Sequence, residues 1–170
     1  MTLALPMPDD KLYLIEPFVG VIRMDLDVLN TQSVYAPFSL TAPSLPNDLT
    51  FDGDGNLYFT DSFQATISRV PAGAGIPTVW FVDPRLASAE PILVGVNGVR
   101  IDKNKKNVYV SVTFQKVRDR PCLSDKARIY KLMSAGFGRD MNSALVPIAP
   151  AVFYAFPQRS IPSEITENQP

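Results

Sequence analysis

Three polar side chains, at two matching places in the chain, have the chemistry of a binding or catalytic site. Asn47 and Asp48 are adjacent, and Asn97 follows 50 residues after Asn47 at the start of a similar apolar run. An asparagine carbonyl oxygen can ligate a hard cation or accept a hydrogen bond from a polar substrate. An aspartate carboxylate can act as a general base. The alternative interpretation is that both asparagines form Asx-type turns that fix the start of a strand.

The residue types that the sequence lacks exclude several other chemistries. The chain of 170 residues has no histidine, which excludes imidazole metal ligands, Ser-His-Asp triads and Cys-His pairs. Its one cysteine, Cys122, cannot form an intrachain disulfide or a multi-cysteine zinc site, and no local signature marks it as a reactive thiol. An active site here must therefore use carboxylates, amides, Lys, Tyr or a bound hard cation.

The run Asp52-Gly53-Asp54-Gly55-Asn56 begins like a calcium-binding loop but is explained as a hairpin turn. An EF-hand loop requires glycine where Leu57 stands and a bidentate glutamate where Phe63 stands. Glycines that accept a positive φ instead suit a tight turn between two short apolar strands, residues 49–51 and 57–60.

An internal repeat surrounds the polar residues. Residues 97–102 match residues 47–52, and residues 108–111 match residues 57–60 after a turn that is one residue longer. Both copies read as short apolar strands separated by polar turns. The repeat therefore predicts that Asn47 and Asn97 occupy equivalent places in two structural units.

A third copy of the repeat lies upstream. Residues 11–16 match residues 56–61, and Ile22 matches Ile67. The apolar strands that close the three copies are residues 33–36, 78–81 and 151–154. Three copies of four short strands, at about 45 to 60 residues per copy, are typical of β-propeller blades. A β-sandwich with chance similarity is the alternative.

The sequence therefore predicts an all-β fold of β-propeller blades, each of four antiparallel strands, with about three blades per chain, or half of a six-bladed propeller. We expect blades at residues 2–38, 47–83 and 97–156 within one domain, residues 1–157, followed by a loosely ordered tail, residues 158–170. In the third blade, residues 134–150 read as an enlarged loop. The first strand of each blade lines the central channel, so Asn47 and Asn97 should converge on its axis.

Composition and charge favour a globular protein without a nucleic-acid or membrane partner. The chain has 46% hydrophobic and 19% charged residues, and its net charge of −1 attracts neither nucleic acid nor anionic lipid. The basic segment 103–131 could bind nucleic acid, but the chain as a whole is slightly acidic, which favours a solvated outer loop. No secretory signal is visible, and the longest apolar stretch, residues 144–156, is too short to span a membrane. These features predict a cytoplasmic location.

The motifs around the polar residues resemble the gluconolactonase/regucalcin (senescence-marker-protein) family. They are Pro46-Asn47-Asp48, Phe51-Asp52-x-Asp54-Gly55, Tyr58-Phe59-Thr60-Asp61, Asn97-Gly98 with Asp102, and Val108-Tyr109-Val110. The resemblance covers about residues 2–156 and implies a six-bladed propeller that binds a divalent cation, often calcium, on its axis. On this resemblance Asn97 matches the metal-ligating asparagine, and Asn47 with Asp48 matches the pair near substrate and metal. A glutamate and a further aspartate of that ligand set have no match here.

The resemblance implies a divalent-metal-dependent hydrolase of lactone or ester type. Asn97 and Asn47 would hold calcium or another divalent cation, Asn47 would also contact the small-molecule substrate, and Asp48 would be the catalytic base. The alternatives are a non-catalytic propeller module that binds a small molecule or protein, and a metal-free natural-product cyclase.

Three blades would leave an apolar face at each open end of the half ring. We therefore expect a homodimer that closes a ring of six blades. A fragment of a longer propeller, or an open wedge of three blades, is the alternative.

Overall fold

The computed structural model describes residues 2–3, 9, 11–25, 27–28, 31–39, 42–88, 94–102, 107–113, 128–133 and 144–150. These residues form twelve strands and one short 3-10 helix, η1 (Pro84–Leu86). The strands make three four-stranded sheets, and every pair of neighbouring strands is antiparallel. The predicted all-β fold built from four-stranded blades is confirmed.

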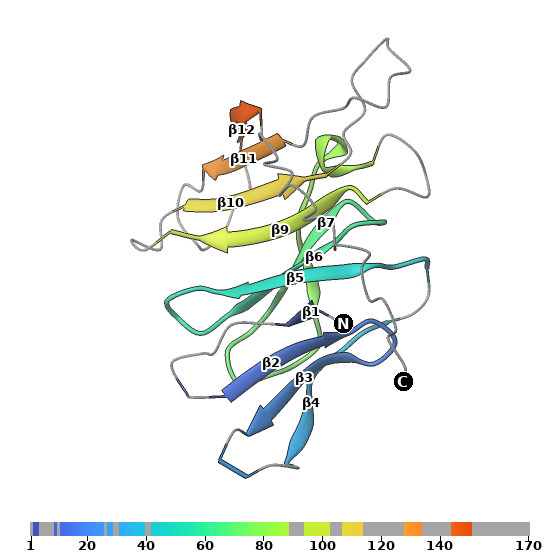
Figure 1. Ribbon diagram of the computed structural model, residues 1–170, viewed down its shortest axis with the longest axis vertical. Coiled ribbons are helices and arrows are strands. Elements are labelled where there is room, and N and C mark those ends of the chain that lie inside the picture. Colours follow the sequence, from blue (N-terminus) through green and yellow to red (C-terminus); the bar gives the residue numbers. More distant parts are fainter. Residues whose placement is uncertain are drawn as a thin grey trace, which may run out of the picture.

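Each sheet is a simple meander whose strands follow chain order. The first sheet contains β1 (Thr2–Leu3), β2 (Lys11–Glu16), β3 (Gly20–Asp25) and β4 (Gln32–Pro37). The second contains β5 (Pro46–Phe51), β6 (Leu57–Asp61), β7 (Thr66–Val70) and β8 (Thr78–Val82). The third contains β9 (Val96–Ile101), β10 (Asn107–Val112), β11 (Arg128–Met133) and β12 (Ala144–Pro150). The sheets stack in chain order, with β5 and β9 side by side (Figure 1).

Two apolar layers separate the three sheets. The layer between the first and second sheets is built on residues such as Tyr13, Ile15 and Phe59, and Tyr13 stacks edge-on against Phe51 with ring centroids 4.8 Å apart. The layer between the second and third sheets is built from the following buried residues: Tyr58, Ala65, Ile67, Phe81, Leu86, Val96, Val99, Val108, Val110, Val112, Tyr130 and Leu132. Burial of these side chains is the main force that holds sheet to sheet.

The second strand of each sheet shows how the sheets are covered. Every residue of β6 is buried, because the second sheet lies between the other two. In β2 only Tyr13 and Ile15 are buried, and in β10 the buried residues are Val108, Val110 and Val112. Successive side chains in a strand point to opposite faces. Tyr13 is the repeat partner of Tyr58, and Val108 that of Leu57, so β2 and β10 bury opposite faces of the repeat.

The Asp52–Asn56 run forms the predicted turn. Oδ1 of Asp52 accepts hydrogen bonds from the backbone N–H groups of Asp54 and Asn56, each at 2.9 Å. Its Oδ2 accepts from Nδ2 of Asn56 at 2.8 Å and from the hydroxyl of Tyr58 at 3.0 Å. Gly55 has φ +83°, the conformation that glycine adopts without strain. The carboxylate is therefore committed to the turn, as expected for a hairpin and not for a calcium loop.

Two details of the sequence interpretation were wrong. The last strand of the third sheet is β12, which lies within residues 134–150, expected to be a loop. Proline is tolerated at an outer edge strand because its missing N–H faces no partner there. The predicted strand 151–154 and the tail 158–170 lie outside the described residues.

The second error is a shift of one residue. Ile15 pairs with Val21 where Thr60 pairs with Ile67, because the turn after β2 is one residue shorter. Val21, not Ile22, is therefore the equivalent of Ile67, and both are fully buried.

Within the described residues, no helix has the length and apolar character to cross a membrane.

Candidate functional site

The predicted polar residues lie in two matching β-bulges. In β5, Pro46 pairs with Asp61 and Leu49 pairs with Phe59, so Asn47 and Asp48 together stand opposite Thr60. In β9, Val99 pairs with Val110 and Val96 with Val112, so Asn97 and Gly98 stand opposite Ser111. A bulge of two residues against one re-aims side chains and is common beside functional sites. The repeat predicted from sequence therefore includes the β-bulge, which occurs at the same place in both sheets.

A hydroxyl group supports the second residue of each bulge. The backbone N–H of Asp48 donates to Oγ1 of Thr60 at 3.2 Å, and the N–H of Gly98 donates to Oγ of Ser111 at 2.9 Å. Gly98 leaves little room there, because a Cβ at this position would lie 2.9 Å from Oγ of Ser111. Each bulge thus keeps its extra N–H group paired, as a partly or fully buried donor requires.

A second hydroxyl orients each asparagine. Nδ2 of Asn47 donates to Oγ of Ser62 at 3.1 Å, and Nδ2 of Asn97 donates to Oγ1 of Thr113 at 3.0 Å. Because the amide nitrogen is held in both cases, the carbonyl oxygen on the other arm of the amide is directed away from the hydroxyl. Both asparagines are half-buried, so these oxygens remain within reach of a ligand.

The two bulges are also joined to each other. The hydroxyl of Thr60 donates to the carbonyl oxygen of Asn97, and that of Ser62 to the carbonyl oxygen of Val96, both at 2.6 Å. Thr60 and Ser62 are buried at 0% and 1% exposure, so the two donating hydroxyl groups are shielded from water. The start of β5 and the start of β9 therefore form one rigid polar unit between the second and third sheets.

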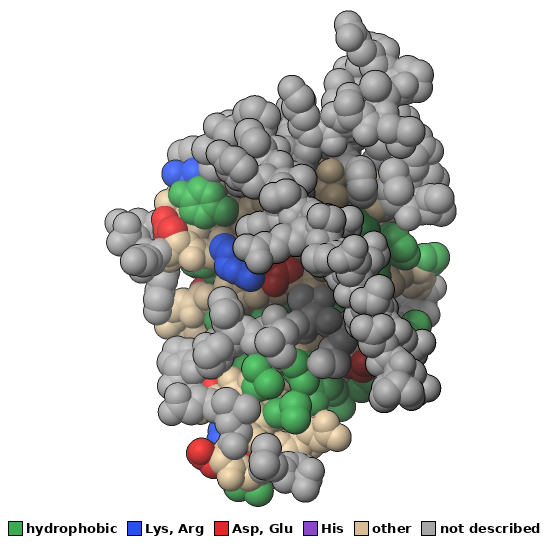
Figure 2. Space-filling view, in the orientation of Figure 1, with side chains coloured by type: hydrophobic (Ala, Val, Ile, Leu, Met, Phe, Trp, Pro, Cys, Tyr) green, Lys and Arg blue, Asp and Glu red, His purple; other side chains and the backbone are tan. Residues whose placement is uncertain are grey.

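Asp48 forms an ion pair across this unit. Its Oδ2 accepts from the backbone N–H of Val99 at 2.9 Å and from Nη1 of Arg100. The same Nη1 donates to the carbonyl oxygens of Val99 and Leu49. The Asp48 side chain is 12% exposed and that of Arg100 is 53% exposed. Figure 2 shows basic and acidic side chains next to one another near the middle of one face, at the level of β5 and β9.

This arrangement bears directly on the predicted cation. Calcium takes six to eight oxygen ligands and needs carboxylate charge for affinity. The described residues offer two neutral amide oxygens and one carboxylate that a guanidinium already neutralises. Among those residues, no group of three or more His, Cys, Asp or Glu side chains is placed to hold a metal ion. The donor set that the structure describes therefore does not fit a divalent cation.

The structure brings together all three residues selected from the sequence, and adds others. Asn47, Asp48 and Asn97 lie in one hydrogen-bonded unit with the residues that sequence reasoning missed: Thr60, Ser62, Gly98, Arg100, Ser111 and Thr113. Four of them repeat as hydroxyl residues two apart, Thr60 and Ser62 in one copy and Ser111 and Thr113 in the next. That spacing was a usable signal. The pairing of Arg100 with Asp48 left no such signal.

The first sheet does not continue the site. At the repeat positions of Thr60 and Ser62 it has Ile15 and Pro17, which have no hydroxyl. The polar unit is therefore a property of the second and third sheets.

Comparison of the sequence with protein-family models and with curated proteins finds no match.

Proposed function

We propose that the paired bulges of β5 and β9 bind a small hydroxylated molecule that carries an anionic group, and that the chain is a small-molecule-binding propeller module. The observation that supports this most directly is the ion pair between Asp48 and Arg100. It sets a guanidinium, already held by a carboxylate, in the same hydrogen-bonded unit as the amides of Asn47 and Asn97.

The guanidinium is well prepared to receive an anion. Its hydrogen bonds to described residues all come from Nη1, which is shared by Asp48, Leu49 and Val99. The other N–H groups belong to a side chain that is 53% exposed. An arginine fork binds a carboxylate or phosphate through two parallel hydrogen bonds. Holding one nitrogen in advance lowers the entropy that ordering the side chain would cost on binding.

The asparagines supply the second half of the recognition. A carbonyl oxygen of an amide accepts hydrogen bonds from hydroxyl groups. Because the nitrogens of Asn47 and Asn97 are tied to Ser62 and Thr113, the oxygens are preorganised as acceptors. An acid with neighbouring hydroxyl groups matches one cation and two acceptors.

A second candidate is the divalent-metal-dependent lactone or ester hydrolase that the sequence predicts. The orientation of the two amides favours it, since no described residue donates to their carbonyl oxygens and an asparagine oxygen is a suitable cation ligand. A cation could use Asp48 only in competition with Arg100, so this candidate also needs ligands beyond the described residues. In that case Asp48 would be the nearby candidate base.

Titration with gluconate and with calcium separates the two candidates. For the module we expect gluconate to shift the Arg100 Nε–H resonance without calcium, and Arg100→Gln to abolish gluconate binding. The control Arg23→Gln, at an exposed residue of β3 outside the polar unit, should leave gluconate binding unchanged. For the hydrolase we expect calcium binding that strengthens in Arg100→Gln, disappears in Asn97→Ala, and accompanies hydrolysis of δ-gluconolactone. Equal gluconate affinity in the unaltered chain and in Arg100→Gln would contradict the module.

The protein partner that we propose is a second copy of the chain. The first and third sheets each have one face that no described residue of another sheet covers, whereas both faces of the second sheet are covered. Association of two copies would cover the outer faces of both end sheets.

A further inference from the structure

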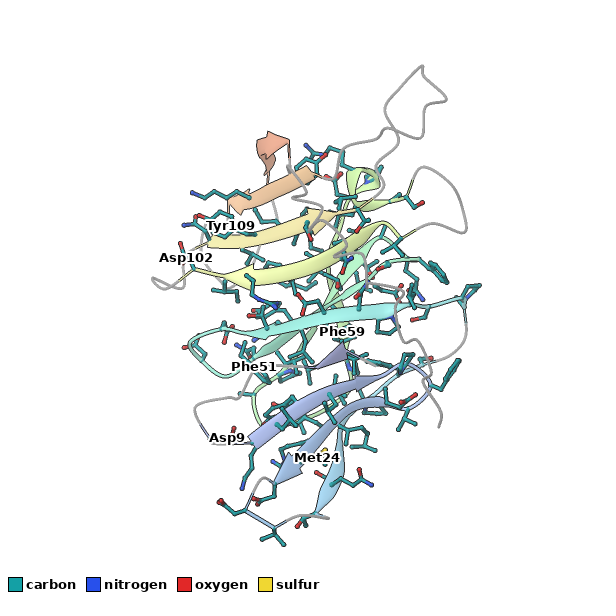
Figure 3. All side chains as sticks on the ribbon, viewed as in Figure 1. Asp9, Met24, Phe51, Phe59, Asp102 and Tyr109 are labelled. Atoms are coloured by element: carbon teal, nitrogen blue, oxygen red, sulfur yellow. The ribbon has the colours of Figure 1, made fainter. Side chains whose placement is uncertain are left out.

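The two sheet faces that no described residue of another sheet covers are opposite faces of the same repeat. In the first sheet the uncovered face carries Leu14, which is half-buried, and in the second and third sheets the equivalent residues Phe59 and Val110 are 4% and 1% exposed. In the third sheet the uncovered face carries Tyr109, also half-buried, whereas its equivalents Tyr13 and Tyr58 are 2% and 1% exposed. Each end sheet therefore leaves uncovered the face that the other two sheets bury against a neighbouring sheet. Tyr109 in the third sheet and Met24 in the first lie toward opposite ends of the stack (Figure 3).

The pairing across strands supports this equivalence. Leu14 stands opposite Ile22, as Phe59 stands opposite Ser68 and Val110 opposite Tyr130. On the other face, an aromatic residue stands opposite a basic one in every sheet; the pairs are Tyr13 with Arg23, Tyr58 with Arg69 and Tyr109 with Lys131. The uncovered face of the third sheet is thus built like the two faces that pack onto a following sheet inside the chain.

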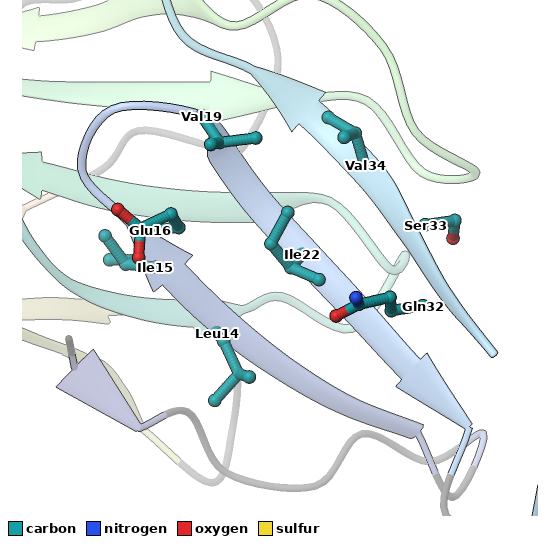
Figure 4. Close-up of a pocket in the computed structure, with 8 residues that line it drawn as sticks. All are labelled: Leu14, Ile15, Glu16, Val19, Ile22, Gln32, Ser33 and Val34. Carbon is teal, nitrogen blue, oxygen red and sulfur yellow. The ribbon is translucent and has the colours of Figure 1, made fainter. Parts of the chain in front are cut away.

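The outer face of the first sheet has a hollow. It lies at the position where, on the second sheet, the neighbouring first sheet packs. The side chains of Leu14, Ile22 and Val34, from three adjacent strands, line a cavity of about 430 Å³ (Figure 4). On the second sheet the equivalent residues Phe59, Ser68 and Val79 line a cavity of about 140 Å³. The smaller cavity is also lined by Pro37 and Phe38, at the end of the first sheet, and the ring of Phe38 lies 5.0 Å from that of Phe59.

From this comparison we infer that two copies associate head to tail: the Tyr109 face of the third sheet in one copy covers the Leu14 and Ile22 face of the first sheet in the other. Two such contacts, related by a two-fold axis, close a ring of six sheets. The contact repeats the packing that already joins the sheets within the chain. Opposite charges favour it, since Glu16 borders the hollow and Lys131 stands beside Tyr109. This inference rests on the second copy proposed above, and is independent of the small-molecule site.

Face-specific variants test the contact by light scattering on the full chain. Ile22→Glu alters the first-sheet face and Tyr109→Glu the third-sheet face, while Val82→Glu, at an exposed position on β8, is the matched control. We expect a dimer of about twice 18.7 kDa for the unaltered chain and the control, and a rise of about tenfold or more in the dissociation constant for each face variant. Val34→Glu, at a position 51% exposed, provides a second first-sheet variant that does not disturb the monomer.

Mixing the two face variants is the decisive step. A mixture of Ile22→Glu and Tyr109→Glu keeps one intact contact, so we expect it to form a heterodimer at concentrations where each variant alone is monomeric. A monomeric unaltered chain would overturn both the second copy as partner and the head-to-tail contact. A dimer that Ile22→Glu breaks and Tyr109→Glu leaves intact would overturn the head-to-tail contact alone, since like faces would then meet. Assemblies larger than two copies would overturn ring closure.

Discussion

Replacing Thr60 by valine tests whether its hydroxyl joins the two bulges. Valine has nearly the shape of threonine and removes one oxygen, so the apolar packing of this fully buried side chain is kept. The change deletes the bond that Asp48 donates to Oγ1 at 3.2 Å and the bond that Oγ1 donates to the carbonyl oxygen of Asn97 at 2.6 Å.

The cost follows from what each partner loses. The N–H of Asp48 is buried, so leaving it unpaired should cost about 1 to 3 kcal/mol. The carbonyl oxygen of Asn97 is partly buried and regains some contact with water, which limits its loss to about 1 kcal/mol. The sum is about 2 to 4 kcal/mol, and for a chain of this length it corresponds to a fall in Tm of about 4 to 16 °C.

Equilibrium unfolding in urea, followed by circular dichroism, measures this loss, and Thr60→Ser is the matched control. Serine keeps the hydroxyl and removes one buried methyl group, which should cost about 1 kcal/mol. The valine variant should therefore be less stable than the serine variant by about 1 kcal/mol or more. If the serine variant is the less stable of the two, the methyl group and not the hydroxyl stabilises this position, and the assignment of Thr60 as the link between the sheets is wrong.

Three other changes have defined outcomes. Gly20→Ala should cost more than about 3 kcal/mol in urea unfolding, because a Cβ at φ +146° would lie 2.1 Å from the carbonyl oxygen of Ala36; a loss below about 1 kcal/mol would contradict this. Burial, reinforced by Asp52, raises the pKa of Tyr58 well above its ordinary value, so the stability that its neutral form contributes is complete below about pH 10 and is lost as the pH rises further. Tyr58→Phe should therefore show a smaller fall in Tm than the unaltered chain between about pH 9 and 11, and parallel falls would refute the assignment. Arg100→Gln should cost about 1 kcal/mol, since Arg100 is half exposed, and this difference should shrink in about 1 M salt; a cost that salt leaves unchanged would point to lost packing instead.

The fold was largely predictable because its signals are local. The turn at Asp52–Asn56 is encoded by residues that bond to one another, and the strands on either side alternate or are continuously apolar. β12 was missed because Gly136, Gly138 and Asn142, residue types that favour loops, lie in the same segment, 134–150. Its two prolines gave no strand signal, although an outer edge strand accepts them. The shift between Ile22 and Val21 arose because a turn one residue shorter leaves no mark in the pattern of apolar residues.

The site was predictable in part. The repeat located Asn47, Asp48 and Asn97 at equivalent places, and the structure joins them through hydroxyl groups. The bulges were not predictable, because an extra residue in a strand appears only in the pairing with its neighbour. The partner of Asp48 was not predictable either, since Arg100 follows 52 residues later and its pairing depends on how two sheets pack.

The polar links between sheets are unevenly distributed, and this sets the order in which the fold opens. Thr60, Ser62 and Asp48 tie the second sheet to the third, whereas among the described residues the second sheet meets the first through apolar packing and one backbone bond, from Gly75 to Tyr35 at 3.1 Å. In a stack of repeats, an end unit held by one weaker boundary unfolds locally before the rest. In a single copy we therefore expect the first sheet to exchange its amide hydrogens first, while the paired bulges stay protected until global unfolding.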